Sequence, residues 1–92
     1  MNTYQLLSTV AHNLKASESD LLDLEQRSWI CSVAKNGNVF LSGRDAFKAR
    51  FILHLRRLRL TDVEIGRVLD TQHPPYSLAE IPQILGHPVP VP

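Results

Sequence analysis

The chain has 92 residues, a length that suits a single domain with a modest core. Its hydrophobic fraction of 43% is ordinary for a globular protein and too high for a disordered one. No apolar run approaches the roughly 18–20 residues that a membrane span needs, and the first residues lack the pattern of a signal peptide. The single cysteine, Cys31, excludes an internal disulfide, so we expect a cytoplasmic protein with a buried thiol and no membrane partner.

The net charge of +1 conceals an uneven distribution along the chain. Residues 1–30 carry a net charge of −2 and residues 61–92 carry −3, whereas residues 31–60 carry +6. The middle segment holds seven Lys and Arg residues against Asp45 alone. Cations concentrated in this way predict an anionic partner, with nucleic acid as the first candidate.

Helix starts are marked by capping boxes, in which an N-cap oxygen acceptor is followed three residues later by an acidic or amide side chain. Read loosely, the pattern recurs at Asn2–Gln5, Ser17–Asp20, Ser42–Asp45, Thr61–Glu64 and Ser77–Glu80. Each instance precedes apolar residues at helical spacing. The sequence therefore predicts five helices, at about residues 3–14, 18–28, 43–59, 62–69 and 78–85.

The apolar residues of these helices form the expected core. Residues 15–17 join the first two helices by a short link, as in a helix-turn-helix. The third helix is the longest, and its apolar stripe begins at Phe47. Leu6, Leu22 and Val63 are expected to be buried on the first, second and fourth helices.

A β-hairpin is predicted between the second and third helices. Residues 29–34 and 39–41 are rich in β-branched and aromatic side chains, and Asn36-Gly37 between them is the strongest short hairpin signal. The sequence thus predicts a mainly α fold with a small β-hairpin, a winged helix-turn-helix. This domain is expected over residues 1–70, and a Pro-rich C-terminal extension with a short helix over residues 71–92.

From about Tyr4 to Leu69 the chain resembles the DNA-binding domain of the MerR family of bacterial regulators. Residues 16–21 are similar to the family's turn and second-helix start, and residues 24–30 to the stretch that leads into the wing. Residues 37–45 resemble the wing and the following cap, and residues 50–65 resemble the third helix and the start of the fourth. The resemblance implies a winged helix-turn-helix and a role in bacterial transcription regulation.

The sequence departs from the family pattern in the second helix, which reads bases in an ordinary helix-turn-helix. Where the family carries an Arg and aromatic residues that hold phosphate, this chain has Leu22, Asp23 and Leu24. The family's long dimerisation helix, effector domain and metal-sensing cysteine pair have no counterpart. The recognition helix is therefore degenerate.

The candidate nucleic-acid-binding residues are mainly basic, because Arg and Lys neutralise phosphates and release condensed counterions. Ser17 and Ser19 could contact phosphate at the N-terminus of the second helix. At helical spacing Arg44, Lys48 and Arg59 share one side of the third helix. The full set is Ser17, Ser19, Lys35, Arg44, Lys48, Arg50, Arg56, Arg57 and Arg59. The opposing interpretation is a solvated face whose cations pair with the acidic ends of the chain.

Two functions follow from these patterns. The first is a small protein that binds double-stranded DNA through the wing and the basic third helix, in transcription regulation or DNA architecture. A short footprint binds weakly alone, so self-association as a homodimer, or a protein partner, is expected. The second is a protein–protein interaction module on a degenerate winged-helix scaffold, with the acidic second helix and the Pro-rich tail facing the partner. No Gly-rich phosphate loop, nucleophile–base pair or metal-ligand spacing is visible, so no enzyme, cofactor or metal is expected.

Overall fold

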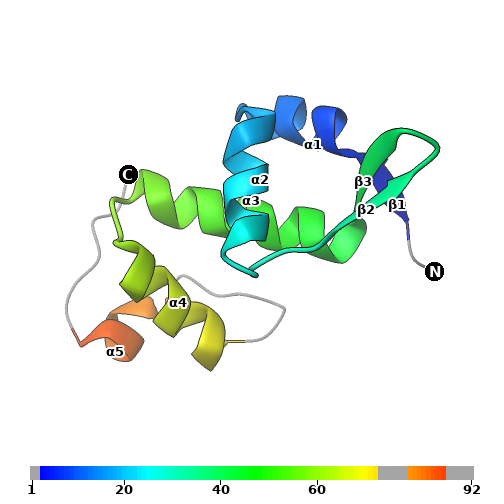
Figure 1. The fold of residues 1–92 in the computed structure, drawn as a ribbon. Coiled ribbons are helices and arrows are strands. Elements are labelled where there is room, and N and C mark those ends of the chain that lie inside the picture. Colours follow the sequence, from blue (N-terminus) through cyan, green and yellow to red (C-terminus); the bar gives the residue numbers. More distant parts are fainter. Residues whose placement is uncertain (1–2, 73–78, 87–92) are drawn as a thin grey trace. The chain divides into compact units, whose positions relative to one another are not determined.

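The computed structural model describes residues 3–72 and 79–86, which are mainly helical with a small three-stranded antiparallel sheet (Figure 1). In chain order the elements are β1 (Tyr4–Leu6), α1 (Leu7–Asn13), α2 (Glu18–Gln26), β2 (Ser32–Lys35), β3 (Asn38–Ser42), α3 (Gly43–Arg57), α4 (Asp62–Thr71) and α5 (Ile81–Leu85). The chain divides into two compact units, Met1–Arg50 and Phe51–Pro92, so that α3 contributes to both.

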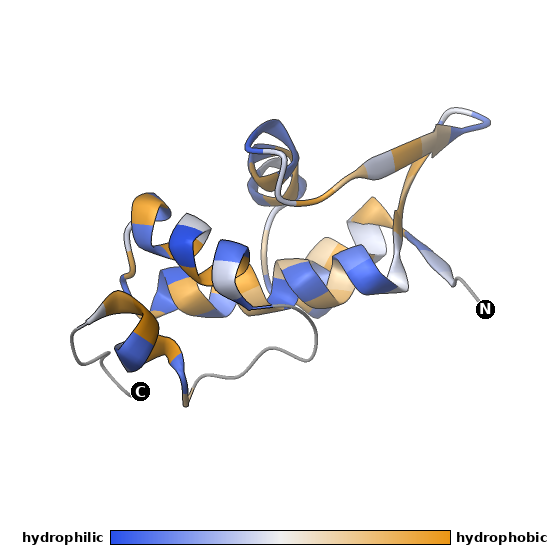
Figure 2. Cartoon of the chain, turned by 90° about the horizontal axis from the view of Figure 1, so that it is seen from below, coloured by the Kyte–Doolittle hydropathy of each residue, from blue (hydrophilic) through white to orange (hydrophobic). Residues whose placement is uncertain are grey.

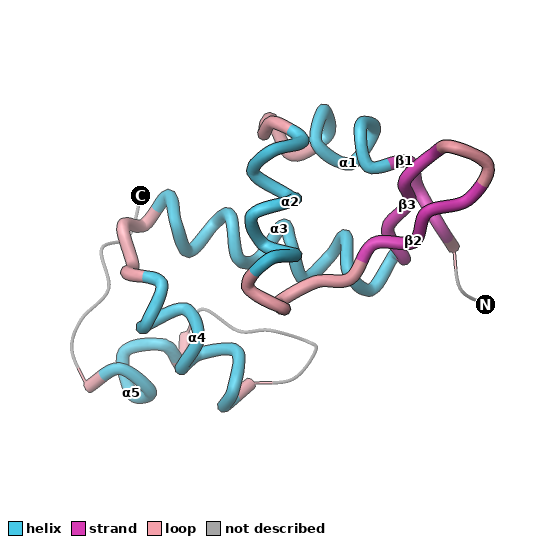
Figure 3. Tube along the Cα trace, in the orientation of Figure 1, coloured by secondary structure: helices cyan, strands magenta, loops and turns pink. Residues whose placement is uncertain are grey.

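The sheet has the order β1-β3-β2, with β3 in the centre (Figure 3). The predicted hairpin is confirmed: β2 and β3 pair from Ser32↔Leu41 to Lys35↔Asn38. Asn36 and Gly37 form its turn with φ of 52° and 76°, the positive values that a type I′ turn requires. The first strand of the hairpin, β2, begins at Ser32 and not at Trp29, because the Trp29 N–H bonds back to the last turn of α2.

The first predicted helix is wrong at its start, where residues 4–6 form β1 instead. These residues pair with β3 in antiparallel register, from Tyr4↔Ser42 to Leu6↔Phe40. The Gly43 N–H extends the ladder by donating to the Thr3 carbonyl at 2.7 Å. Pairing with a strand some 36 residues away thus replaces the local helical pattern, and the capping partner proposed for Gln5, Asn2, lies outside the described residues.

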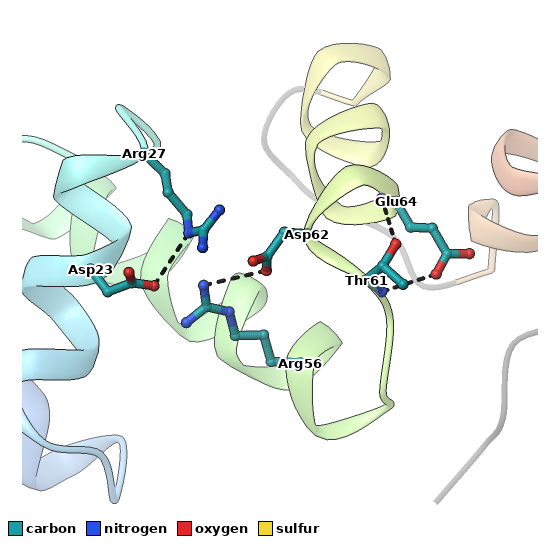
Figure 4. Close-up of polar contacts among 6 residues, drawn as sticks. All are labelled: Asp23, Arg27, Arg56, Thr61, Asp62 and Glu64. Atoms are coloured by element: carbon teal, nitrogen blue, oxygen red, sulfur yellow. Dashed lines mark hydrogen bonds and ion pairs between the residues drawn. The ribbon is translucent and has the colours of Figure 1, made fainter.

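Capping boxes are complete at α2 and α4. Ser17 Oγ accepts from the Asp20 N–H at 3.1 Å, while the Asp20 carboxylate accepts from the Ser17 N–H at 3.1 Å. Thr61 and Glu64 form the same reciprocal pair at α4 (Figure 4). At α3, Ser42 Oγ accepts from the Asp45 N–H but donates its own proton to the Asp45 carboxylate, so only half of the box forms.

The last predicted helix is shorter than expected. It begins at Ile81 and not at residue 78, and the proposed cap Ser77 lies outside the described residues. Pro82 falls in the first turn of α5, where a missing N–H leaves no helical hydrogen bond unmade. Proline is therefore compatible with this helix.

Three helices end in the same way, with a residue of positive φ followed by an apolar residue whose N–H bonds back to the last turn. Lys15, Ser28 and Arg59 have φ of 55°, 62° and 66°. The next N–H in each case donates to a carbonyl five residues back, as in Trp29 N–H to Leu24 O at 3.1 Å. This is the Schellman motif, which favours glycine at the left-handed position. None of the three is glycine, so the sequence carries no signal for these ends, and α2 and α3 end at Gln26 and Arg57, before the predicted ends.

In the first unit, buried apolar residues come from every helix and from β3, and α1 packs on α2, β1 and β3. Figure 2 shows hydrophobic and hydrophilic stretches alternating along the helices. The buried set is Leu7, Val10, Ala11, Leu21, Leu24, Ile30, Leu41 and Ala49. Three expected core residues are exposed instead: Leu6 to 40%, Leu22 to 42% and Phe47 to 50%. Cys31, expected to be buried, is also exposed.

In the second unit, α4 packs on α5, and apolar residues of both helices and of the second half of α3 are buried. Ile65 and Val68 of α4 and Ile81 of α5 are fully buried. Val63, expected in this core, is 74% exposed, because the buried side of α4 follows the spacing of Ile65 and Val68.

We predict that Gly37→Val destabilises the hairpin by about 1–3 kcal/mol, because a β-branched residue resists positive φ. Hydrogen exchange of the β2 and β3 amides should accelerate while the helical circular dichroism persists. Gly37→Asn, which tolerates this conformation, is the control. Unchanged protection in Gly37→Val would contradict the assigned turn.

We also predict that Lys15→Gly raises the free energy of unfolding by about 0.5–1 kcal/mol. Glycine removes the cost of a Cβ in the left-handed region, which exceeds the extra chain entropy that glycine loses on folding. Lys15→Ala keeps the Cβ and removes the same charge, so it should not stabilise. Urea denaturation of the three proteins measures the difference, and equal stability of the Gly and Ala variants would disprove the explanation.

Candidate nucleic-acid interface

The nine candidate residues fall into both units. Six lie in the first unit: Ser17, Ser19, Lys35, Arg44, Lys48 and Arg50. Three lie in the second: Arg56, Arg57 and Arg59.

The first unit carries three cations on the N-terminal half of α3. Arg44 and Lys48 are one helical turn apart and share one side of the helix, while Arg50 lies farther round. Arg44 and Arg50 are exposed, and Lys48 is half-buried. Among the described residues, no carboxylate forms an ion pair with any of the three within 4.0 Å. These side chains can therefore reach an external anion without first breaking an internal pair.

Lys35 is the last residue of β2 and lies beside the hairpin turn. It is exposed and pairs in register with Asn38. Together with Tyr4, Val33 and Phe40 it lines a shallow cavity of about 400 Å³ on one face of the sheet. Lys35 thus stands at the edge of an apolar depression.

Ser17 and Ser19 lie at the N-terminus of α2, where their hydroxyls are 2.9 Å apart. Ser17 Oγ already accepts a hydrogen bond from the Asp20 N–H, which is one of the amides that a bound phosphate would need. Glu18 and Asp20 place two carboxylates in the same turn. Their charge opposes that of a phosphate, so this end of α2 is the weakest part of the candidate set.

In the second unit, Arg56 forms an internal ion pair. Its Nη2 lies 3.4 Å from Asp62 Oδ1 across the turn between α3 and α4 (Figure 4). Arg57 is exposed at the last position of α3. Arg59 is exposed beyond the helix end, in the left-handed conformation, so its predicted place on the same helical side as Arg44 and Lys48 is wrong.

Arg27, outside the candidate set, is likewise engaged. Its Nε lies 3.3 Å from Asp23 Oδ2, one turn earlier on α2, and its guanidinium carbon lies 5.6 Å from the centre of the Trp29 ring. The interpretation in which cations of the basic middle segment pair with the acidic ends of the chain therefore holds for Arg56, whereas the Arg27–Asp23 pair lies within the first acidic segment. It does not extend to the cations at the start of α3.

The sequence reasoning missed Tyr4 and Phe40, which line the cavity beside Lys35. Tyr4 was assigned to a helix, so nothing placed it on a sheet next to a residue of the hairpin. The signal that could have revealed it is the apolar alternation of Tyr4 and Leu6, which matches a strand as well as a helix start.

Comparison of the chain with models of known protein families, with characterised proteins and with solved structures finds no match. Within residues 3–72 and 79–86, no three His, Cys, Asp or Glu side chains gather in a way that could hold a metal ion. None of the helices in these ranges has the length and apolar character needed to cross a bilayer.

Proposed function

We propose that the chain is a small DNA-binding protein of the winged helix-turn-helix type, acting in transcription regulation or DNA architecture. The observation that carries the proposal is the set of cations at the start of α3. Arg44, Lys48 and Arg50 project from the N-terminal half of α3 and have no acidic partner in the described part of the chain. In this scheme they neutralise phosphates of double-stranded DNA, which releases condensed counterions and drives binding.

The order of the elements supports the same proposal. Two helices, α1 and α2, are joined by a short turn, and an antiparallel hairpin then leads directly into α3. In the proposed winged helix-turn-helix this hairpin serves as the wing, and Lys35 would place a charge at its tip. The acidic α2 makes extensive base reading unfavourable, so the proposed contacts position the protein on the duplex backbone and carry little sequence information.

We predict that Arg44→Gln combined with Lys48→Gln weakens binding to two unrelated duplexes by similar factors. Phosphate contacts do not read sequence, so their loss is uniform. The slope of log affinity against log salt should become shallower by about two units, one for each contact removed. Fluorescence anisotropy at several salt concentrations measures both quantities.

The matched control is Lys15→Gln combined with Arg67→Gln, which removes two exposed cations that lie outside α3. This variant has the same net charge as the test variant. If both variants lose affinity equally, binding depends on net charge alone and the assigned surface is wrong. If the wild-type chain does not bind duplex DNA at low salt, the proposal fails altogether.

The second candidate function is a protein–protein interaction module, and the surface of α2 favours it. Leu22 is 42% exposed on a helix whose other exposed residues include Glu18 and Asp20. An apolar side chain beside carboxylates suits a basic, partly apolar protein surface better than it suits a polyanion.

We predict that Glu18→Gln combined with Asp20→Asn raises duplex affinity about two-fold or more at low salt, because two repulsive charges are removed near the phosphates. The amide of Asn can still accept from the Ser17 N–H, so the cap of α2 is kept. The gain should shrink as salt is added. An unchanged affinity would mean that α2 faces away from DNA, and would favour the interaction module.

A further inference from the structure

One face of the sheet is apolar and open to solvent. Side chains alternate between the two faces of a strand, and directly paired residues share a face. The pairs Leu6↔Phe40 and Val33↔Phe40 therefore place Leu6, Phe40 and Val33 on one face, together with Tyr4 and Lys35, two residues farther along their strands. Leu41, on the opposite face, is fully buried. We call the solvent-facing side, formed by Tyr4, Leu6, Val33, Lys35 and Phe40, the outer face.

The exposure of the outer face is unusual for such apolar residues. Tyr4 is 51% exposed, Leu6 40% and Val33 46%, and these residues come from two different strands. The cavity of about 400 Å³ lies on this face and is lined by Tyr4, Val33, Lys35 and Phe40. Contiguous exposed apolar surface on a small protein commonly marks a binding site.

The charge on the outer face indicates which kind of ligand it binds. Lys35 is its one charged residue, and the other outward positions, Asn38 and Ser42, are neutral. A second copy docked face to face offers Lys35 no anionic partner, because the outer face carries no acidic residue. The fitting occupant therefore combines flat apolar groups with negative charge.

We propose that the outer face binds single-stranded DNA, with unpaired bases stacked on Tyr4 and Phe40 and a neighbouring phosphate held by Lys35. Tyr4 and Phe40 are diagonal neighbours across β1 and β3, an arrangement that separates the two residues by about 7–8 Å, with their Cβ atoms somewhat closer. That is roughly twice the 3.4 Å rise of one nucleotide in a stacked strand. Aromatic rings on an exposed sheet, flanked by a cation, are a general platform for unpaired bases.

This site is separate from the proposed duplex contact, because its aromatic residues lie on the sheet and not on α3. It adds an interaction with bases to a protein whose other candidate residues reach only phosphate. Lys35 is common to both proposals, so the tests that distinguish them change Tyr4 or Phe40 and leave Lys35 in place.

The experiment measures fluorescence anisotropy of a labelled oligothymidine, using the full chain, against an oligonucleotide of equal length with abasic sites. Both probes carry the same phosphates, but only the first has bases to stack. We expect the abasic probe to bind more weakly by about five-fold or more, the range of one lost base–aromatic stack. Equal binding of the two probes would overturn the proposal, because phosphate contacts alone would then account for the affinity.

Substitutions locate the site. Tyr4→Ala should weaken binding to oligothymidine by about five-fold or more, whereas Tyr4→Phe, which keeps the ring, should stay within about two-fold of the wild type. Because Phe40 lies in the central strand, Phe40→Leu is used to remove the ring while keeping apolar volume, and a similar loss is expected. Circular dichroism confirms that each variant is folded.

The matched control is Phe47→Ala. Phe47 is 50% exposed, close to the exposure of Tyr4, but it lies on α3 and not on the sheet. It should bind oligothymidine like the wild type. An equal loss in Phe47→Ala and Tyr4→Ala, or no loss in Tyr4→Ala, would overturn the assignment. An RNA oligonucleotide that binds about ten-fold tighter than the DNA would overturn the choice of DNA, since stacking alone does not sense the 2′-hydroxyl.

The two proposals fail in different ways. If the Arg44→Gln, Lys48→Gln variant keeps oligothymidine binding while the wild type does not bind duplex DNA, the duplex proposal falls and the outer-face site stands. If oligothymidine does not bind the wild type at low salt, the outer-face proposal falls whatever the duplex result.

Discussion

The pairing of β3 with a strand on each side is the constraint on which the first unit depends. β1 has three residues and β2 has four, and such short strands are not stable without a partner. β3 supplies the partner for both, and its Leu41 is fully buried beneath the sheet. The same strand runs directly into α3, because Ser42 ends one element and caps the next. The position of the basic start of α3 is therefore fixed by the sheet.

That constraint also creates the outer face. Tyr4 would lie on a helix if the local pattern alone decided its structure. Pairing with Ser42 turns its side chain to the same side as Phe40, although the two residues are 36 positions apart in the sequence. A surface made in this way combines residues that have no relation in the linear pattern. Its apolar character results from three strands together and from none of them singly.

The helix starts were largely predictable from the sequence, whereas the helix ends were not. Ser17–Asp20 and Thr61–Glu64 are local patterns whose hydrogen bonds form within one turn, so reading four residues was sufficient. The ends at Lys15, Ser28 and Arg59 use a left-handed conformation that glycine signals and these residues do not. The hairpin was predicted because Asn36-Gly37 is an equally local signal. β1 was missed because its partner is distant.

For the candidate site, too, the sequence predicted what local spacing decides and missed what distant contacts decide. The sequence located Arg44 and Lys48 on the third helix, since helical spacing alone places them together. It did not reveal that Arg56 is held by Asp62 or that Arg59 follows the helix end, because both depend on how α3 terminates. Nor could it place Tyr4 beside Phe40, because that contact requires the register of β1 on β3. Charge counts identified the basic segment, but they overstated how many of its cations can contact an external anion from α3.

The long sequence separation between β1 and its partner β3 also affects how the first unit folds. The β2–β3 hairpin closes a two-residue turn, a process of microseconds, whereas docking β1 must first close a loop of some 36 residues. A contact of such long sequence separation raises the contact order and forms after the local elements. β1 is then the last strand added and, with only three paired residues, the first to open. Native-state fluctuations should expose the β1 edge of β3 while the hairpin and helices remain formed.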